Sequence, residues 1–281
     1  MADARKIIKK IGGSKKGSTR RSSSTRRKSR VMSRWKYVTI AALITIGVIL
    51  IAYPFIRQAF NRFVPCTGLN IYGACIPKGY SVYGIDISHH QGNINWGKLK
   101  SGTKEDPPIS FVYTKATEGC SHQDTQFKKN WKAAKDYGFI RGAYHFFSAE
   151  SSGEEQAKMF IKNVKLEPGD LPPMVDVEQD TKNNVAAYRE NLSAFILTLE
   201  KHYGVKPIIY TYKDFHEKYI DNWFNEYPLW IARYNVPHPN IDDAWIIWQC
   251  SENGVLPGIK RKVDINVFNG SIIDLMDLTI K

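Results

Sequence analysis

The sequence has few cysteines and none of the patterns in which cysteine and histidine hold a structural metal. The chain has 281 residues and four cysteines, Cys66, Cys75, Cys120 and Cys250, with no CxxC motif. Zinc sites need Cys and His ligands at short, regular spacings, so we expect no metal and no cofactor. Cys66 and Cys75 follow an apolar segment closely, and they are expected to form a disulfide if they lie outside the cytosol.

Most of the chain also lacks net charge, although the whole chain carries +13. Residues 1–36 contain 14 Lys and Arg and one acid, Asp3, whereas the rest contains 26 bases and 26 acids. The main domain therefore has no electrostatic reason to bind nucleic acid. The tail, residues 1–36, is rich in Ser, Gly, Lys and Arg and is expected to be disordered. It could bind nucleic acid or form the positive flank of a membrane anchor, and we favour the anchor.

Residues 37–56 contain no charged side chain. Twenty apolar residues in a helix match the hydrocarbon thickness of a bilayer, about 30 Å. The excess of Lys and Arg on the N-terminal side predicts a cytoplasmic N-terminus and a main domain outside the membrane, periplasmic or extracellular. A cleaved signal peptide is the rival, but the basic region is long and no small-x-small cleavage site follows. Cys66 follows Val-Pro, which argues against a lipoprotein. We therefore expect a single-pass signal anchor in the cytoplasmic membrane.

Residues 57–80 are expected to be a linker, and residues 81–281 a globular domain with alternating strands and helices. A helical pattern at Phe127, Trp131 and Ala134 and a stripe from Tyr188 to Tyr203 separate early strands. The last gaps between strands are short and carry no helical pattern. Eight strand-like runs with early helical crossovers predict an irregular α/β barrel, with a doubly wound open sheet as the alternative. The runs are Tyr83–Ser88, Ser110–Ala116, Ile140–Phe147, Pro173–Glu178, Pro207–Tyr212, Leu229–Tyr234, Trp245–Ser251 and Val263–Phe268.

Acids recur at the ends of these apolar runs. Asp176 and Glu178 stand two residues apart in one strand-like run, so they should point to the same face. Two carboxylates held close together push their pKa values apart, which suits a general acid beside an ionised partner. Asp86 and Asp264 lie inside two other apolar runs, where an unpartnered acid is costly. Glu118 is expected in the loop that follows the second run.

Aromatic and histidine side chains accompany these acids. Tyr144, Phe146, Tyr210 and Trp230 could stack on sugar rings or fill the core. The histidines show no spacing typical of metal ligands, so we expect His89, His90 and His145 to be loop and cleft residues.

Several of these motifs together resemble glycoside hydrolase family 25, the Chalaropsis-type lysozymes. They are YGIDISHHQGNINW from Tyr83, FVYTKATEG from Phe111, GAYHF from Gly142, PMVDVE from Pro173, WQCS from Trp248 and VDIN from Val263. The resemblance covers about residues 81–270. It implies a (β/α)5β3 barrel that cleaves the β-1,4 bond between N-acetylmuramic acid and N-acetylglucosamine in peptidoglycan. Cys250 departs from the family pattern and is expected to alter the cleft wall.

The family's acids carry over to Asp86, Asp176, Glu178 and Asp264. Our hypothesis makes Glu178 the general acid, and Asp176 the group that polarises the substrate's acetamido group in a retaining reaction. A direct Asp nucleophile and an inverting reaction stay open. Gln249 and Glu118 are further candidates for substrate binding, although Glu118 is rather expected to support its loop.

Two other classes of function remain. The domain could be a membrane-anchored peptidoglycan-binding module without activity, or the basic tail could tether DNA with the barrel secondary.

Overall fold

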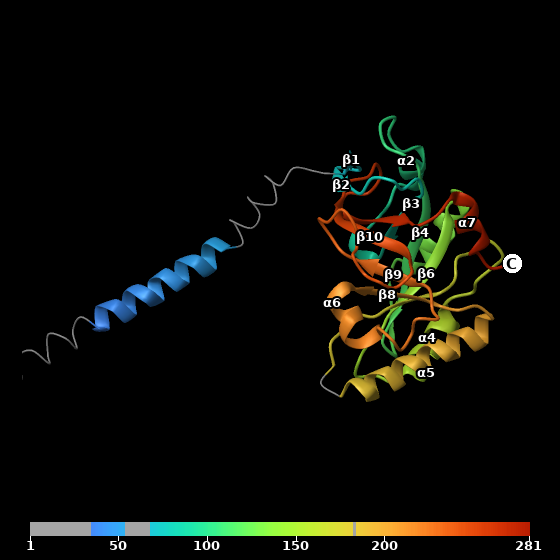
Figure 1. Cartoon of the computed structure of the whole chain (residues 1–281). Helices are drawn as coiled ribbons and strands as arrows, with labels where there is room; N and C mark the ends of the chain where they lie inside the picture. The colour runs from blue at the N-terminus through green and yellow to red at the C-terminus, as the bar shows by residue number, and fades with distance from the viewer. Residues whose placement is uncertain (1–34, 54–67, 182–183) are drawn as a thin grey trace, which may run out of the picture. The chain divides into compact units, whose positions relative to one another are not determined.

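The structure is a computed structural model that describes residues 35–53, 68–181 and 184–281. It divides the chain into two compact units, Met1–Pro65 and Cys66–Lys281. In the first unit Trp35–Tyr53 form one helix, drawn in blue in Figure 1, which is long and apolar enough to cross a membrane, as signal sequences also are. The Thr45 hydroxyl donates to the carbonyl oxygen of Ala41, which satisfies this polar group within the helix. The basic tail up to residue 34 and residues 54–56 of the expected span lie outside the described residues.

The second unit is built around a closed barrel. Each strand from β3 to β10 pairs in parallel with its neighbour in the barrel, and β11 pairs antiparallel with both β10 and β3. The barrel strands are β3 (Tyr83–Ile87), β4 (Ile109–Glu118), β6 (Ile140–Phe146), β7 (Met174–Asp176), β8 (Ile208–Tyr212), β9 (Leu229–Ala232), β10 (Trp245–Gly254) and β11 (Val263–Phe268). All eight predicted strands are present, and the predicted irregular barrel is confirmed over the open sheet.

Helices cover only part of the barrel. Ser152 begins α4 by accepting a hydrogen bond from the Glu155 amide, and Gly204, with φ +70°, ends α5. The helices are η1 (His89–Gln91), α2 (Trp96–Ser101), α3 (Phe127–Asp136), α4 (Gly153–Asn163), α5 (Val185–Tyr203), α6 (Lys213–Phe215), η2 (His216–Ile220) and α7 (Ile272–Asp277). Residues 233–244 and 255–262 contain no helix, as the sequence predicted. Part of the outer surface of the barrel therefore needs another cover.

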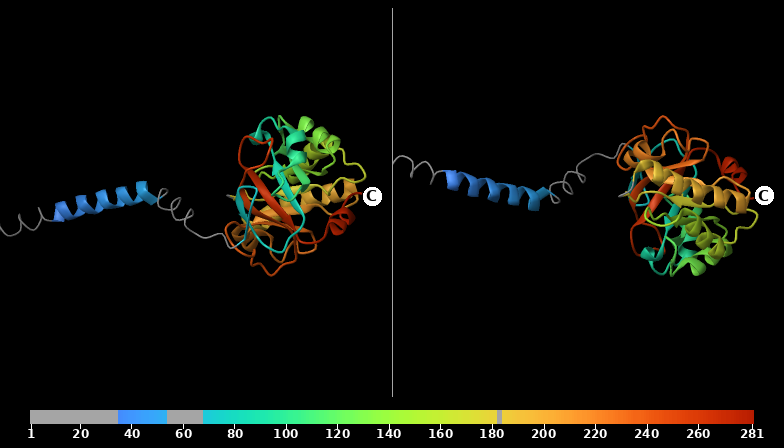
Figure 2. Two further views of the ribbon diagram at one scale, coloured as in Figure 1. Left: turned by 90° about the horizontal axis from the view of Figure 1, so that it is seen from above. Right: turned by 90° about the horizontal axis from the view of Figure 1, so that it is seen from below.

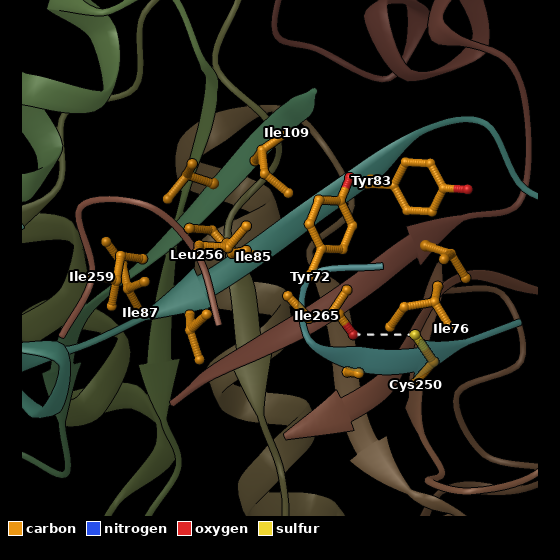
Figure 3. Packing of buried hydrophobic residues seen from close by; sticks show 14 of the residues in the cluster. Tyr72, Ile76, Tyr83, Ile85, Ile87, Ile109, Cys250, Leu256, Ile259 and Ile265 are labelled. Carbon is orange, nitrogen blue, oxygen red and sulfur yellow. Dashed lines mark hydrogen bonds between the residues drawn. The ribbon is translucent and has the colours of Figure 1, made fainter. Parts of the chain in front are cut away.

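A short hairpin supplies that cover. Strands β1 (Leu69–Ile71) and β2 (Ala74–Ile76) are joined by Tyr72 and Gly73, which both have positive φ, as a tight two-residue turn requires. Tyr72 and Ile76 belong to one buried cluster with outward-facing side chains of β3 and β11 (Figure 3). In Figure 2, α5 lies in front when the molecule is seen from below. When it is seen from above, β11 and the cyan segment at the start of the second unit lie in front. The hairpin and α5 thus cover different sides of the barrel.

The hairpin corrects two expectations. The compact unit begins at Cys66 rather than near Ser81, because apolar residues of the expected linker pack on the barrel. Cys250 does not form the cleft wall: it faces outward into the same cluster as Tyr72 and Ile76 (Figure 3), since side chains alternate along β10. Cys75 is disulfide-bonded, and its expected partner Cys66 lies outside the described residues. Cys120 and Cys250 are free thiols.

Candidate active site

The four predicted acids meet at one end of the barrel. Asp86 and Asp176 lie at the carboxyl ends of β3 and β7, where parallel barrels place their active sites. Asp264 lies near the start of β11, and because β11 runs antiparallel to β3, the pairing sets Asp264 opposite Asp86. Glu178 follows β7 by two residues. All four acids line one cleft of about 390 Å³.

The rest of the cleft wall mixes aromatic, amide and charged groups. The other lining residues are Ile87, Ser88, His90, Gln91, Lys115, Tyr144, Phe146, Met174, Tyr210, Tyr234, Gln249 and Glu252. A concave site with an apolar wall and a few converging polar groups is typical of a pocket for a small ligand or a sugar.

Asp86 is held by two side-chain amides. Gln249 Nε2 donates to Asp86 Oδ1 at 3.0 Å, and Asn266 Nδ2 donates to the same oxygen at 2.7 Å. Burial raises the pKa of Asp86, and these two hydrogen bonds oppose the rise. The bonds favour the ionised form of Asp86, since both partners are donors.

The two amides are themselves oriented by aromatic donors. Tyr210 Oη donates to Gln249 Oε1 at 2.9 Å, and Tyr234 Oη donates to the same oxygen. Because the amide oxygen of Gln249 is occupied in this way, its NH₂ group must face Asp86. Trp230 Nε1 donates to Asn266 Oδ1 at 3.0 Å and fixes that amide in the same sense.

Asp176 has a buried oxygen that no described group satisfies. Its side chain is buried, and Oδ1 has no hydrogen-bond partner in the described part of the chain. Burial, followed by the charge of Glu178, raises the pKa of Asp176 well above its usual range, and Lys115 opposes the rise. An unsatisfied buried acceptor is costly in a folded protein, so this oxygen is suited to receive a donor from a ligand.

Glu178 and Asp264 also titrate above the usual range of carboxyls. Burial and then the charge of Asp86 raise the pKa of Glu178. Burial and then the charges of Asp86 and Glu252 raise the pKa of Asp264 to about 8. Asp176 and Glu178 are coupled as like charges, so the pair retains a proton at a higher pH than an isolated carboxyl does.

The predicted aromatic residues divide between the cleft and the core. Tyr144, Phe146 and Tyr210 line the cleft. The prediction for Trp230 was wrong, because its side chain is fully buried inside the barrel, against Tyr113 and Tyr210. Trp230 contacts the site from behind, through its hydrogen bond to Asn266 and its packing against Tyr210.

Glu118 is not a loop residue and does not line the cleft. It is the last residue of β4 and pairs with His122 of β5 (His122–Gln123). Its Oε2 lies 2.7 Å from Lys115 Nζ, and Lys115 does line the cleft. The structure therefore agrees with a supporting role for Glu118 rather than with direct contact to a substrate.

The three histidines hold different places. His90 lines the cleft, while His89 Nδ1 lies 2.7 Å from Asp124 Oδ2 outside it. His145 is buried between Thr117 and Gln156, and burial lowers its pKa to about 4. Within the described residues, no group of three or more His, Cys, Asp or Glu side chains is arranged to hold a metal ion.

Lys115, Asn266 and Glu252 were not predicted as site residues, and Tyr234, an aromatic of the run Leu229–Tyr234, was not selected among the candidates, although each influences the acids. Lys115 and Asn266 lie within the quoted motifs, two residues after the inward-facing Tyr113 and Asp264, so strand alternation could have found them. Tyr234 and Glu252 come from segments in which alternation gives no direction, because Tyr234 lies beyond β9 and Glu252 follows an irregularity in the β10 pairing.

Comparison with known proteins agrees with this geometry. The family model for glycosyl hydrolases family 25 matches residues 85–259. The chain is 36% identical over 260 residues to the Escherichia coli (strain K12) protein YegX, covering 88% of this chain and 95% of that protein. It is 33% identical over 213 residues to lysozyme M1 of Streptomyces globisporus, covering 70% of this chain and 71% of the lysozyme.

Solved structures give the same result. A family 25 glycosyl hydrolase from Bacillus anthracis superposes with a TM-score of 0.65 at 34% identity, covering 72% of this chain and 94% of that chain. A bacterial lysozyme from Streptomyces coelicolor superposes with a TM-score of 0.64 at 33% identity, covering 71% of this chain and 97% of that chain. By sequence motif, barrel topology and family match, the chain belongs to the glycosyl hydrolases of family 25.

Proposed function

We propose that this protein is a muramidase, which hydrolyses the β-1,4 bond between N-acetylmuramic acid and N-acetylglucosamine in peptidoglycan. The observation that carries the proposal is the pair Asp176 and Glu178, set in a cleft with Asp86 and Asp264. Relatives in sequence are named lysozyme M1 and N,O-diacetylmuramidase. A binding module without activity has no need for four neighbouring acids whose charges oppose one another.

Glu178 is the general acid in the proposed mechanism. Its carboxyl proton passes to the glycosidic oxygen that leaves, while the bond from that oxygen to the anomeric carbon of N-acetylmuramic acid breaks. The raised pKa of Glu178 suits this task, because the group keeps its proton closer to neutral pH. Glu178 then takes a proton from the water that completes the hydrolysis.

Asp176 assists the substrate's own acetamido group. Its unpartnered Oδ1 accepts a hydrogen bond from the acetamido N–H, so that the acetamido carbonyl oxygen attacks the anomeric carbon. This hydrogen bond favours the ionised form of Asp176 and leaves the shared proton on Glu178. The product keeps the anomeric configuration of the substrate. A direct Asp nucleophile would give the same configuration through a covalent sugar, and an inverting reaction the opposite one.

The proposal also includes a location. The apolar segment 37–56, which begins within the helix Trp35–Tyr53, is the membrane anchor, with residues 1–36 in the cytoplasm and the barrel outside the cytoplasmic membrane. The disulfide at Cys75 supports an oxidising compartment. Peptidoglycan glycan strands lie in that compartment.

The deciding experiment is muropeptide analysis of purified peptidoglycan treated with the detergent-solubilised full chain, wild type beside Glu178→Gln. We expect new reducing ends on N-acetylmuramic acid, with activity at least about 100-fold lower in the variant. Lys158→Gln, which changes an exposed charge on α4, is the matched control and should retain activity. Reducing ends on N-acetylglucosamine would contradict the bond assignment. Wall binding without cleavage would instead indicate the binding module.

A further inference from the structure

Lys115 stands apart in a cleft that is otherwise acidic. The cleft is lined by Asp86, Asp176, Glu178, Glu252 and Asp264, and among the described lining residues Lys115 is the only side chain with a permanent positive charge. Lys115 follows Phe111 and Tyr113 on the inward face of β4, and its side chain is only 10% exposed. A buried ammonium needs partners to offset its lost hydration.

Two partners hold the Lys115 ammonium in place. Its Nζ lies 2.7 Å from Glu118 Oε2, and it lies 4.7 Å from the ring centroid of Phe146. Phe146 pairs with Asp176 across β6 and β7, so the ring that carries the ammonium belongs to the strand beside the acid pair. The Glu118 carboxyl is 43% exposed and does not line the cleft, whereas Lys115 lines it together with the acids.

We propose that Lys115, held by Glu118 and by the face of Phe146, is a positioning residue that sets the number of protons carried by the Asp176–Glu178 pair. This inference rests on the proposed function, because a muramidase needs one member of the pair protonated and the other ionised. The five acids of the cleft without a fixed cation would retain more protons at neutral pH, and Asp176 could not accept the acetamido hydrogen bond as an anion.

The electrostatics of the acid pair agree with this geometry. Lys115 lowers the pKa of both Asp176 and Glu178, against burial and the other acids, which raise it. For Glu118, burial raises the pKa, but the hydrogen bond and charge of Lys115 outweigh it and lower the pKa overall. The other titratable groups that line the cleft around the pair are Asp86 from β3, His90 from η1, Tyr144 from β6, Tyr210 from β8, Tyr234 after β9, Glu252 from β10 and Asp264 from β11.

The test uses three variants of the full chain that separate charge from shape. Lys115→Met keeps an unbranched stem on Phe146 but removes the charge, Lys115→Arg keeps the charge, and Glu118→Gln removes the negative partner. We expect both limbs of the pH profile of kcat/KM to move to higher pH in Lys115→Met, with about a tenfold loss at the wild-type optimum. In Glu118→Gln both limbs of the pH profile should move to lower pH. In Lys115→Arg, which keeps the positive charge, both limbs should stay where they are in the wild type.

The opposite signs distinguish the proposal from a structural role. If Lys115 merely supported the fold, Lys115→Met and Glu118→Gln would both lower the activity and the thermal midpoint, and the limbs of the pH profile would not move. Unchanged limbs in Lys115→Met, or limbs that move in the same direction in Lys115→Met and Glu118→Gln, would overturn the proposal. Lys158→Met, on the exposed face of α4, controls for the loss of one positive charge.

A second readout does not depend on turnover. Carboxyl ¹³C chemical shifts of the full chain follow the titration of Asp176 and Glu178 without substrate. We expect their midpoints to rise in Lys115→Met, and unchanged midpoints would contradict the role of Lys115. If the wild type releases no muropeptides but these midpoints still rise, the muramidase proposal fails while the electrostatic role of Lys115 stands.

Discussion

Among single residues, Asp264 has a raised pKa that links the cleft to the stability of the fold. Its pKa is about 8 in the folded chain against 3.8 as the ordinary value. Between these two pH values the folded state holds a proton that the unfolded state has released. Folding stability is therefore lost as pH rises through this window, by up to about 1.4 kcal/mol per pH unit. Keeping Asp264 in the cleft therefore lowers the stability of the folded state.

We therefore predict that Asp264→Asn is more stable than the wild type at neutral pH. The two proteins should have the same thermal midpoint near pH 4, and the advantage of the variant should grow up to about pH 8, because Asn mimics the neutral acid. Thermal denaturation across this range measures the difference.

Asp274→Asn serves as a control of opposite sign. Hydrogen bonds from Ser271 lower the pKa of Asp274, so its contribution is present at neutral pH and is lost in acid. This variant should be less stable than the wild type at pH 7. Equal midpoints for Asp264→Asn and the wild type at all pH values would contradict the raised pKa.

At the residue scale, the sequence predicted correctly that the acids lie together in one cleft and was wrong about Trp230, while the catalytic roles of the acids stay predictions. An acid inside an apolar strand must face a polar space, so its position indicated the cleft correctly for Asp86, Asp176 and Asp264. A tryptophan in a strand can lie in the core or at a surface. The alternation of side chains predicts the face of the strand on which it lies, but not its depth along the barrel. The amide network around Asp86 depends on residues from β10 and β11, whose register no local pattern specifies.

Among the elements, the β1–β2 hairpin is one that the sequence did not predict. Its strands have three residues each, too few for an alternating pattern to stand out. The long helices α3 and α5 were predictable because their apolar stripes and stop signals are local. The hairpin takes its conformation from contacts with the barrel, among them the hydrogen bond from Tyr72 Oη to the Pro107 carbonyl, 2.8 Å long.

We predict that the hairpin stabilises the barrel as a helix would. Ile76 is fully buried against the barrel, so Ile76→Ala should lower the free energy of unfolding by about 2–5 kcal/mol. Leu69 lies in the same hairpin but is 37% exposed, and Leu69→Ala should change the free energy of unfolding by less than about 0.5 kcal/mol. Denaturant unfolding of the full chain measures both. A hairpin that only links the barrel to the anchor would give two small and equal effects.

Across the whole molecule, the net positive charge, the apolar helix and the barrel occupy successive parts of the chain. The basic residues of the tail precede the apolar helix, and the barrel portion is neutral. Composition alone predicted this arrangement, because it depends on sums over long segments rather than on contacts.

For the whole molecule we predict one membrane crossing with the barrel outside. Protease added to spheroplasts should digest epitopes within residues 68–281 and spare an epitope at residue 1. The protein should stay in the membrane fraction at alkaline pH, with an intact N-terminus by mass spectrometry. A soluble form that begins after Tyr53 would show that the helix is a cleaved signal sequence.

The pairing of β11 with β3 has a consequence for the timing of synthesis. Asp86 and Asp264 face each other across this pair, although they lie on the first and last strands of the barrel. A ribosome makes the chain from its N-terminus, so Asp86, Asp176 and Glu178 all emerge before the strand that closes the barrel. The full set of acids exists only once nearly the whole chain has been made. A nascent or prematurely ended chain therefore carries no assembled cleft, and synthesis itself delays hydrolysis until the protein is complete.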